Sequence, residues 1–311
     1  YRAVFLSRAL ASIAAQTDQR FRVYVGDDGS PEPIEECILR SPLPPSQVLY
    51  VRFGENLGRT SLTRHWERCI DLSQEPWVWL FSDDDEMDES CVEGFYEALS
   101  RSGGHHDVYR FEVEVIDEKS TITEMQPPAP EVESWNKFTY FLLRGLRCCV
   151  QQQLIFRKAA YEAVGRFLDL PLAWCSDHAF AIKMATKRGL YTMRKGALRF
   201  RQSGLNISSA RCSATDRLKL EATMGYVRWL RKHIREYGKD EFPDRETLME
   251  LARQRFLQCL RVQGRVLAGS ELAAVVRFMS RELGFTRRAA VVRIGYYGLN
   301  GWMRKMRQLL A

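Results

Sequence analysis

The sequence predicts an α/β domain with a parallel sheet flanked by helices, followed by a helical C-terminal region. Over residues 1–85, helical periodicity alternates with short runs of β-branched and aromatic residues. That alternation is typical of parallel strands joined by crossover helices. Residues 77–81 (WVWLF) are continuously apolar, as expected of a strand covered on both faces. After about Ala214 the pattern is helical.

Composition excludes two classes of protein. Of the 311 residues, 45% are hydrophobic and 27% are charged, values that exclude a disordered chain. No apolar run reaches the roughly 18 residues that a membrane-spanning helix requires. The eight cysteines are scattered without a C-x-x-C pair, which favours reduced, buried thiols over disulfides or a zinc site. We therefore expect a cytoplasmic protein.

Local patterns place the individual elements. Apolar residues at helical spacing predict a helix over 4–16, and the β-rich run 21–26 predicts a strand. Ser30 followed by Pro31 combines a capping hydroxyl with a proline at the first helical position, which predicts a helix over 31–40. Further along, the same criteria predict strands at 48–53, 77–81, 107–116, 151–156 and 190–201, and helices at 58–72, 135–146, 158–164 and 177–188.

The C-terminal region differs in charge from the rest. Residues 211–311 carry 21 Lys and Arg against 10 Asp and Glu, whereas residues 1–210 are acidic on balance. We place the domain boundary between 210 and 211, and the only later strand signal is at 290–297. Basic residues recur at helical spacing at Arg228, Arg231, Lys232 and Arg235, and again at Arg287, Arg288, Arg293, Arg304, Lys305 and Arg307 with Tyr296, Tyr297 and Trp302 nearby.

Two interpretations of this basic region stay open. Its helices can pack with their charges in solvent, or they can make a peripheral contact with an anionic membrane at the inner face of the plasma membrane. A nucleic-acid-binding module is a third reading. We expect no nucleic-acid partner, because no RNA-binding motif is visible and the first domain is acidic.

Two acidic clusters follow predicted strands. Asp27 and Asp28 end the first strand, and Asp83, Asp84 and Asp85 follow the strand at 77–81. The carboxyl ends of parallel strands share one edge of a sheet, where ligands bind. Three consecutive carboxylates suit Mg²⁺ or Mn²⁺ held together with substrate phosphates. The alternatives are a solvated turn for the triplet and an Asx turn for the pair.

Two further residues could carry chemistry. Asp177 opens a predicted helix, where it can act as a general base or as a helix cap. His178 beside it is better explained as structural. Arg201 ends the predicted strand at 190–201, where it can hold phosphates or simply lie on the surface.

Several ordered motifs together resemble the family 2 glycosyltransferases of the GT-A fold, over about residues 1–210. No single motif is specific, but their order and spacing are. The motifs are 9–13 (ALASI) with Gln16-Thr17, 25–30 (VGDDGS), 56–58 (NLG), 82–85 (SDDD), 164–167 (VGRF), Ser176-Asp177, and 201–204 (RQSG) with 206–208 (NIS).

This resemblance implies a GT-A fold with a mixed, mostly parallel sheet and an inverting transfer of sugar from a nucleotide-diphosphate donor to an acceptor hydroxyl. The acceptor would be a glycan or a lipid-linked molecule in surface polysaccharide or glycoconjugate synthesis. The implied roles are the nucleotide base for Asp28, the ribose for Asp83, Mg²⁺ or Mn²⁺ for Asp84 and Asp85, further donor contacts for Arg59 and Arg201, and the catalytic base for Asp177.

The chain departs from the family pattern at two places. It begins at Tyr1, where the first strand of the family would end, so we expect a strand to precede Tyr1 and to lie inside the sheet. Ser176 stands where the family has an acidic neighbour of the base. A different metal-dependent nucleotide-diphosphate transferase, which would share the acidic triplet without needing Asp177, is the alternative enzyme class.

Overall fold

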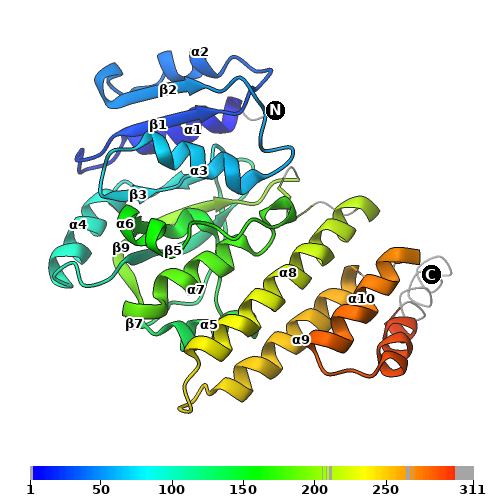
Figure 1. Ribbon diagram of the computed structural model, residues 1–311. Coiled ribbons are helices and arrows are strands. Elements are labelled where there is room, and N and C mark those ends of the chain that lie inside the picture. The colour runs from blue at the N-terminus through cyan, green and yellow to red at the C-terminus, as the bar shows by residue number, and fades with distance from the viewer. Residues whose placement is uncertain are drawn as a thin grey trace. The chain divides into compact units, whose positions relative to one another are not determined.

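The computed structural model describes residues 3–204, 206–207, 209, 212–263, 267 and 269–297. Its contacts divide the chain into two compact units (Figure 1). The first unit runs to Asp169 and resumes over Ser176–Asn206, and the second comprises Leu170–Cys175 and the chain from Ile207 onward. The division thus falls a few residues before the predicted boundary. The return of Leu170–Cys175 to the second unit has no signal in the sequence.

A two-stranded parallel sheet begins the first unit. Val23 of β1 pairs with Val48 of β2, and the register continues to Asp27 and Arg52. Buried Leu6 and Leu10 of α1 form a small core with neighbouring apolar side chains. The elements are α1 (Ala3–Ala14), β1 (Val23–Asp27), α2 (Ile34–Leu39), the 3-10 turn η1 (Pro45–Gln47), β2 (Val48–Arg52) and α3 (Leu62–Leu72).

The predicted cap of the second helix is wrong. Helix α2 begins at Ile34 after Pro33, with no side-chain cap. The Ser30 hydroxyl instead accepts a hydrogen bond from the Glu32 backbone N–H, 3.1 Å away, within a turn. The reason is Pro33, because a proline disfavours helical geometry in the residue that precedes it.

A seven-stranded mixed sheet forms the rest of the first unit. Its strand order is β3-β8-β5-β9-β4, with β6 paired to β5 and β7 paired to β9. Only β5 and β9 are parallel, and the other pairings are antiparallel. The strands are β3 (Trp77–Trp79), β4 (Glu86–Met87), β5 (Val108–Ile116), β6 (Ile122–Met125), β7 (Val132–Glu133), β8 (Leu154–Arg157) and β9 (Leu190–Arg201).

This sheet confirms the predicted α/β class, although fewer pairings are parallel than expected. Strands such as β4 and β7 are too short to show a pattern in the sequence, and they pair antiparallel with β9. Among the described strands, β1 pairs only with β2. The additional strand expected before Tyr1 stays a prediction.

Helices pack on the large sheet around an aromatic core. Helix α4 contacts β9, and α7 contacts β5, β9 and α5. The core under α4 includes Phe95, Tyr109, Phe111 and Met193, each at most 5% exposed. The remaining elements are α4 (Cys91–Arg101), α5 (Trp135–Leu143), η2 (Gln151–Gln153), α6 (Lys158–Ala163) and α7 (Ser176–Arg188).

The second unit is helical where the structure describes it. Phe256 and Phe278 lie in its core with ring centroids 4.7 Å apart. The strand suggested at 290–297 is wrong, because residues 287–297 are helical, with Ala290 and Ile294 buried four positions apart. Its elements are η3 (Pro171–Ala173), α8 (Ser213–Tyr237), α9 (Arg245–Gln263) and α10 (Gly269–Glu282).

None of the helices in the described ranges is long and apolar enough to cross a membrane. Of the basic and aromatic residues expected to contact a membrane, Trp302, Arg304, Lys305 and Arg307 lie outside the described residues.

Candidate active site

The acidic turn after β1 is held by hydrogen bonds to both of its carboxylates. Asp27 is buried, and its Oδ1 accepts from the Ser30 backbone N–H at 2.7 Å. Its Oδ2 accepts from the Tyr50 hydroxyl at 2.8 Å and from Arg52 at 3.1 Å. Asp27 therefore fits the Asx-turn alternative, in which the carboxylate organises the local chain.

Asp28 links this turn to the loop before α3. Its Oδ1 accepts from the Leu57 backbone N–H at 2.9 Å, and its Oδ2 accepts from the Gly58 N–H at 2.8 Å. The Arg68 guanidinium also donates to Oδ1. A Cβ at position 58 would lie 2.6 Å from Asp28 Oδ2, so glycine is required for this approach. Most of the acceptor capacity of Asp28 is thus used within the protein.

Arg68 and His65 complete this acidic site, and the sequence reasoning missed both. The Arg68 guanidinium lies 3.8 Å from the centre of the Phe53 ring and donates to the Glu55 carbonyl at 3.0 Å. His65 Nδ1 lies 3.4 Å from Asp28 Oδ1. Burial lowers the pKa of His65 and outweighs the opposing effect of Asp28. The only available signal was their spacing of three residues on one helix, which is too common to be informative.

The acidic turn after β3 differs because one carboxylate oxygen is unsatisfied. Asp84 Oδ1 accepts from the Ser82 hydroxyl at 2.6 Å. Asp85 is 1% exposed, and its Oδ1 accepts from the Arg201 backbone N–H at 2.8 Å. Its Oδ2 is buried without a hydrogen-bond partner. Burial, assisted by the charge of Asp84, raises the pKa of Asp85 well above its usual range.

The side chain of Arg201 is internal and supports this turn. It is 0% exposed, and its Nε donates to the Asp84 carbonyl at 2.7 Å. Its other nitrogens donate to the Asp117 carbonyl at 2.5 Å, to the Ser120 hydroxyl at 3.1 Å and to the Glu86 carboxylate. The structure therefore corrects the surface reading of Arg201, because the side chain is buried and most of its donors are engaged with the protein. Its role in holding a phosphate stays a prediction.

The acidic turn fits a divalent cation shared with a phosphate ligand. Among the described residues, no group of three or more His, Cys, Asp and Glu side chains is placed to hold an ion. Mg²⁺, however, commonly takes one or two carboxylates and completes its shell with water and substrate phosphates. A buried carboxylate oxygen without a partner is costly unless a ligand satisfies it. Asp85 Oδ2 is such an oxygen, and Asp83 and Asp84 directly precede it in the chain, so this turn would offer carboxylates to such a cation.

Asp177 lies in the first turn of α7, which begins at Ser176. Its Oδ1 accepts from the His178 backbone N–H at 2.8 Å, and its side chain is 22% exposed. His178 Nε2 lies 4.0 Å from the same oxygen. Asp177 is therefore a partly accessible carboxylate in the first turn of a helix.

The segment before α7 has an unusual backbone. Leu172, Ala173 and Cys175 have positive φ values of 60°, 50° and 67°, which are unfavourable for residues other than glycine. Within the second unit, the buried Lys219 ammonium lies 4.7 Å from the centre of the Trp174 ring. This contact involves Trp174, which lies two residues before Ser176 in the chain.

The remaining candidate, Arg59, is exposed beside the loop that Asp28 holds. Its backbone N–H donates to Asn56 Oδ1 at 3.1 Å. The structure thus joins Asp84, Asp85 and Arg201 in one hydrogen-bonded group and places Arg59 next to the Asp28 loop. It sets Asp177 at the start of α7.

The comparisons with known proteins agree with this architecture. The family model described as glycosyl transferase family 2 matches residues 2–165, more than half of the chain. No curated protein is significantly similar to this chain.

A crystal structure of S. aureus TarS 1-349 in complex with UDP-GlcNAc is similar to this chain, with a TM-score of 0.59 at 14% identity, over 97% of this chain and 89% of that one. TarS 1-349 without that ligand matches over the same shares at 14% identity with a TM-score of 0.55. At that identity the likeness shows the fold alone. The match of the family model shows more: the chain belongs to glycosyl transferase family 2 and is a glycosyltransferase.

Proposed function

We propose that this glycosyltransferase is inverting and metal-dependent, and that it moves a sugar from a nucleotide-diphosphate donor to an acceptor hydroxyl. The observation that carries the proposal is the acidic turn after β3, where Asp85 Oδ2 is buried without a hydrogen-bond partner. Such an oxygen in a turn of three carboxylates is suited to bind a divalent cation. The cation can in turn bind the diphosphate of the donor.

A uridine-diphosphate sugar is the first donor to test. One of the similar TarS structures contains UDP-GlcNAc, which supports this choice for the present chain. In the proposed complex, Asp84 and Asp85 hold Mg²⁺ or Mn²⁺, and Asp83 contacts the ribose. Asp28 contacts the nucleotide base, and Arg59 makes a further contact with the donor. When bound, the cation would stabilise the negative charge that develops on the departing diphosphate.

Asp177 is proposed to act as the general base. Its carboxylate would accept the proton of the acceptor hydroxyl while that oxygen forms a bond to the anomeric carbon. The bond between the anomeric carbon and the diphosphate oxygen breaks on the opposite face, so the configuration inverts. A general base must come within hydrogen-bond reach of the hydroxyl, directly or through one water, and the partial exposure of Asp177 supports the proposal.

We further propose that the acceptor is a glycan or a lipid-linked molecule used in surface polysaccharide or glycoconjugate synthesis. An enzyme with that task would work in the cytoplasm, at or near the inner face of the plasma membrane. The basic C-terminal region supports this location, since clustered Lys and Arg are attracted to anionic lipid surfaces.

The metal dependence is tested by screening nucleotide sugars, beginning with UDP-GlcNAc, for release of the nucleoside diphosphate. We expect release with Mn²⁺ or Mg²⁺, its loss in a chelator and its recovery when metal is added back. Full activity in the chelator would contradict the metal-dependent mechanism.

The catalytic base is tested by Asp177→Asn, which keeps the shape and the hydrogen bond from His178. Transfer should fall by roughly 10²–10⁴, with donor affinity near that of the wild type. A matched control is Asp169→Asn, an exposed carboxylate that bonds Ser61 and Thr63. NMR of the product should show an inverted anomeric centre. Retained configuration would contradict the inverting mechanism, and an unchanged rate in Asp177→Asn would contradict the role of Asp177 as the base.

A further inference from the structure

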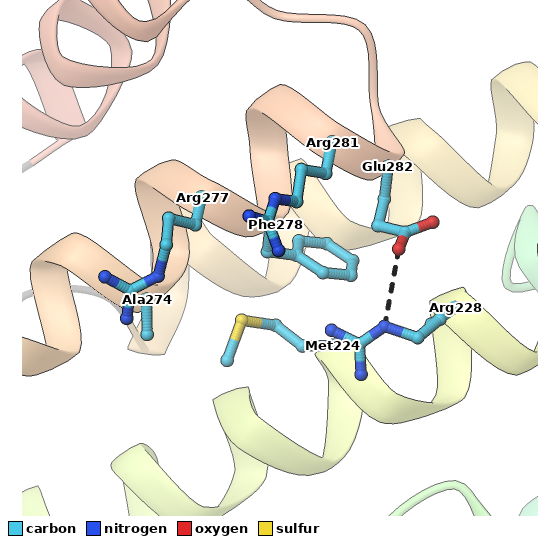
Figure 2. A pocket seen from close by; sticks show the side chains of 7 residues that line it. All are labelled: Met224, Arg228, Ala274, Arg277, Phe278, Arg281 and Glu282. Atoms are coloured by element: carbon cyan, nitrogen blue, oxygen red, sulfur yellow. Dashed lines mark ion pairs between the residues drawn. The ribbon is translucent and has the colours of Figure 1, made fainter.

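The second unit contains a pocket between α8 and α10. The cavity has a volume of about 420 Å³ and is lined by side chains from these two helices (Figure 2). Its lining combines three arginines and one glutamate with apolar side chains, so it carries an excess of two positive charges. The lining residues are Met224, Arg228, Ala274, Arg277, Phe278, Arg281 and Glu282.

Among the residues that the structure describes, the two arginines of α10 have no acidic partner. Arg277 and Arg281 are exposed and four positions apart on one helix, so they are neighbours on its surface. Neither forms an ion pair with a residue that the structure describes. The acidic residues of α10 are already engaged with α8: Glu271 pairs with Arg217 at 3.2 Å, and Glu282 pairs with Arg228 at 3.4 Å. Like charges at this spacing destabilise a helix, and a bound anion would relieve that repulsion.

The third arginine and the apolar residues define the rest of the pocket. The Arg228 guanidinium lies 5.6 Å from the centre of the Phe278 ring, and Phe278 is 3% exposed. Figure 2 shows Glu282 facing Arg228 across the pocket, with Met224 and Phe278 between the helices. Charged groups therefore lie beside a short apolar surface formed mainly by Met224, Ala274 and Phe278.

We propose that this pocket binds a phosphate ester, with the phosphate held by Arg277 and Arg281 and the attached organic group resting on the apolar side chains. Guanidinium groups donate paired hydrogen bonds that match phosphate oxygens. The volume exceeds what a phosphate alone requires and lies in the range of small-molecule sites. The ester can come from a soluble phosphate compound or from a lipid headgroup, which present the same chemistry to the pocket.

Removing the charge of Glu282 should change the affinity for a phosphate ester in the opposite direction from removing the two arginines. The Glu282 carboxylate lies in the pocket and neutralises Arg228, so it should weaken anion binding. Arg277→Gln/Arg281→Gln should bind a phosphate ester about tenfold more weakly than the wild type. Glu282→Gln, which frees Arg228, should bind it about two- to threefold more tightly.

The experiment is calorimetric titration of the full chain with inorganic phosphate and with glycerol 1-phosphate, at low and high salt. A chelator is present throughout, so that a cation-dependent diphosphate site does not contribute. The matched control is Arg235→Gln/Arg261→Gln, which removes the same two charges from exposed positions on α8 and α9 outside the pocket lining. Circular dichroism melting of each variant checks that the fold is retained.

Co-sedimentation with phosphatidylglycerol and phosphatidylcholine vesicles distinguishes the sources. Loss of glycerol 1-phosphate binding in the Arg277/Arg281 variant alone supports a site for soluble esters. A headgroup site is supported if only that variant loses binding to phosphatidylglycerol vesicles and the wild type shows no measurable binding of the soluble esters. Equal weakening by the control pair would show diffuse charge attraction and overturn the pocket, as would equal binding by all variants.

Discussion

The two acidic turns of the first unit look alike in sequence but differ in structure. After β1, Asp27 and Asp28 receive hydrogen bonds on all four carboxylate oxygens. After β3, Asp85 keeps one buried oxygen without a partner. A satisfied carboxylate holds its own chain in place, whereas a buried unsatisfied one costs free energy until a ligand reaches it. The difference teaches that carboxylates in a similar setting can be fully satisfied within the protein or can keep a buried oxygen without a partner, as the proposed cation site requires.

Among changes to the two turns, the largest expected effect comes from Asp85→Asn. This change keeps the size of the side chain but removes the anionic ligand, so Mn²⁺ affinity and metal-dependent transfer should both fall. We expect a loss of about 10³-fold in transfer, equivalent to about 4 kcal/mol of charge stabilisation. Manganese titration by electron paramagnetic resonance measures the binding directly. Unchanged Mn²⁺ affinity would contradict the proposal that the turn after β3 binds the cation. Asp84→Asn, measured in parallel, compares the two proposed ligands.

Arg201→Met should have the largest effect on stability. It removes the guanidinium that bonds the Asp84 carbonyl and leaves the Glu86 carboxylate without its ion pair. Breaking a buried pair on one side costs about 3–5 kcal/mol. Urea unfolding measures the loss. The control is Arg199→Met, which removes a more exposed arginine of the same strand that pairs with Asp88 and Glu114. If the two variants are equally stable, the second turn does not depend on Arg201.

Asp28→Ala should destabilise the protein by about 1–3 kcal/mol, because the Leu57 and Gly58 N–H groups and Arg68 lose their acceptor. Asp28→Asn retains an acceptor oxygen and should cost less. If Asp28 also contacts a nucleotide base, donor affinity falls in Asp28→Asn while stability is largely kept. Denaturant unfolding and donor titration together separate the two roles.

The smallest effect is expected for Tyr50→Phe. It removes one hydroxyl that donates to Asp27 while Ser30 and Arg52 still donate. A loss of about 0.5–1.5 kcal/mol in unfolding free energy is expected, without a change in the metal dependence of transfer. A change in metal affinity here would mean that the first turn also takes part in binding the cation.

The accuracy of the sequence predictions depended on how local their signals are. Helices α1 and α7 and strands β5 and β9 were predicted within a few residues, because periodicity and apolar runs are properties of the segment itself. Ser30 was misassigned because Pro33, three residues further on, decides where α2 begins. The helix at 287–297 was read in part as a strand because a short apolar run is ambiguous without its packing partners.

The candidate site was predictable only in part. The positions of the acidic turns at strand ends and the family resemblance followed from motifs. The engagement of Arg201 could not be predicted, since its partners Asp84, Asp117 and Ser120 lie more than 80 residues away in the chain. The pocket of the second unit has no signal in the sequence either. Arg277 and Arg281 belong to no motif, and Arg228 belongs only to a basic helical pattern.

The sequence alone determined the α/β class, the order of most elements and the presence of two acidic turns after strands. The tertiary structure decided which carboxylates are satisfied, where Arg201 lies, and how Leu170–Cys175 joins the second unit. The physical reason is the range of the interactions. Helical periodicity and turn chemistry act within a few residues, but hydrogen bonds and burial depend on which distant segments meet in the fold, and no short stretch of sequence records that meeting.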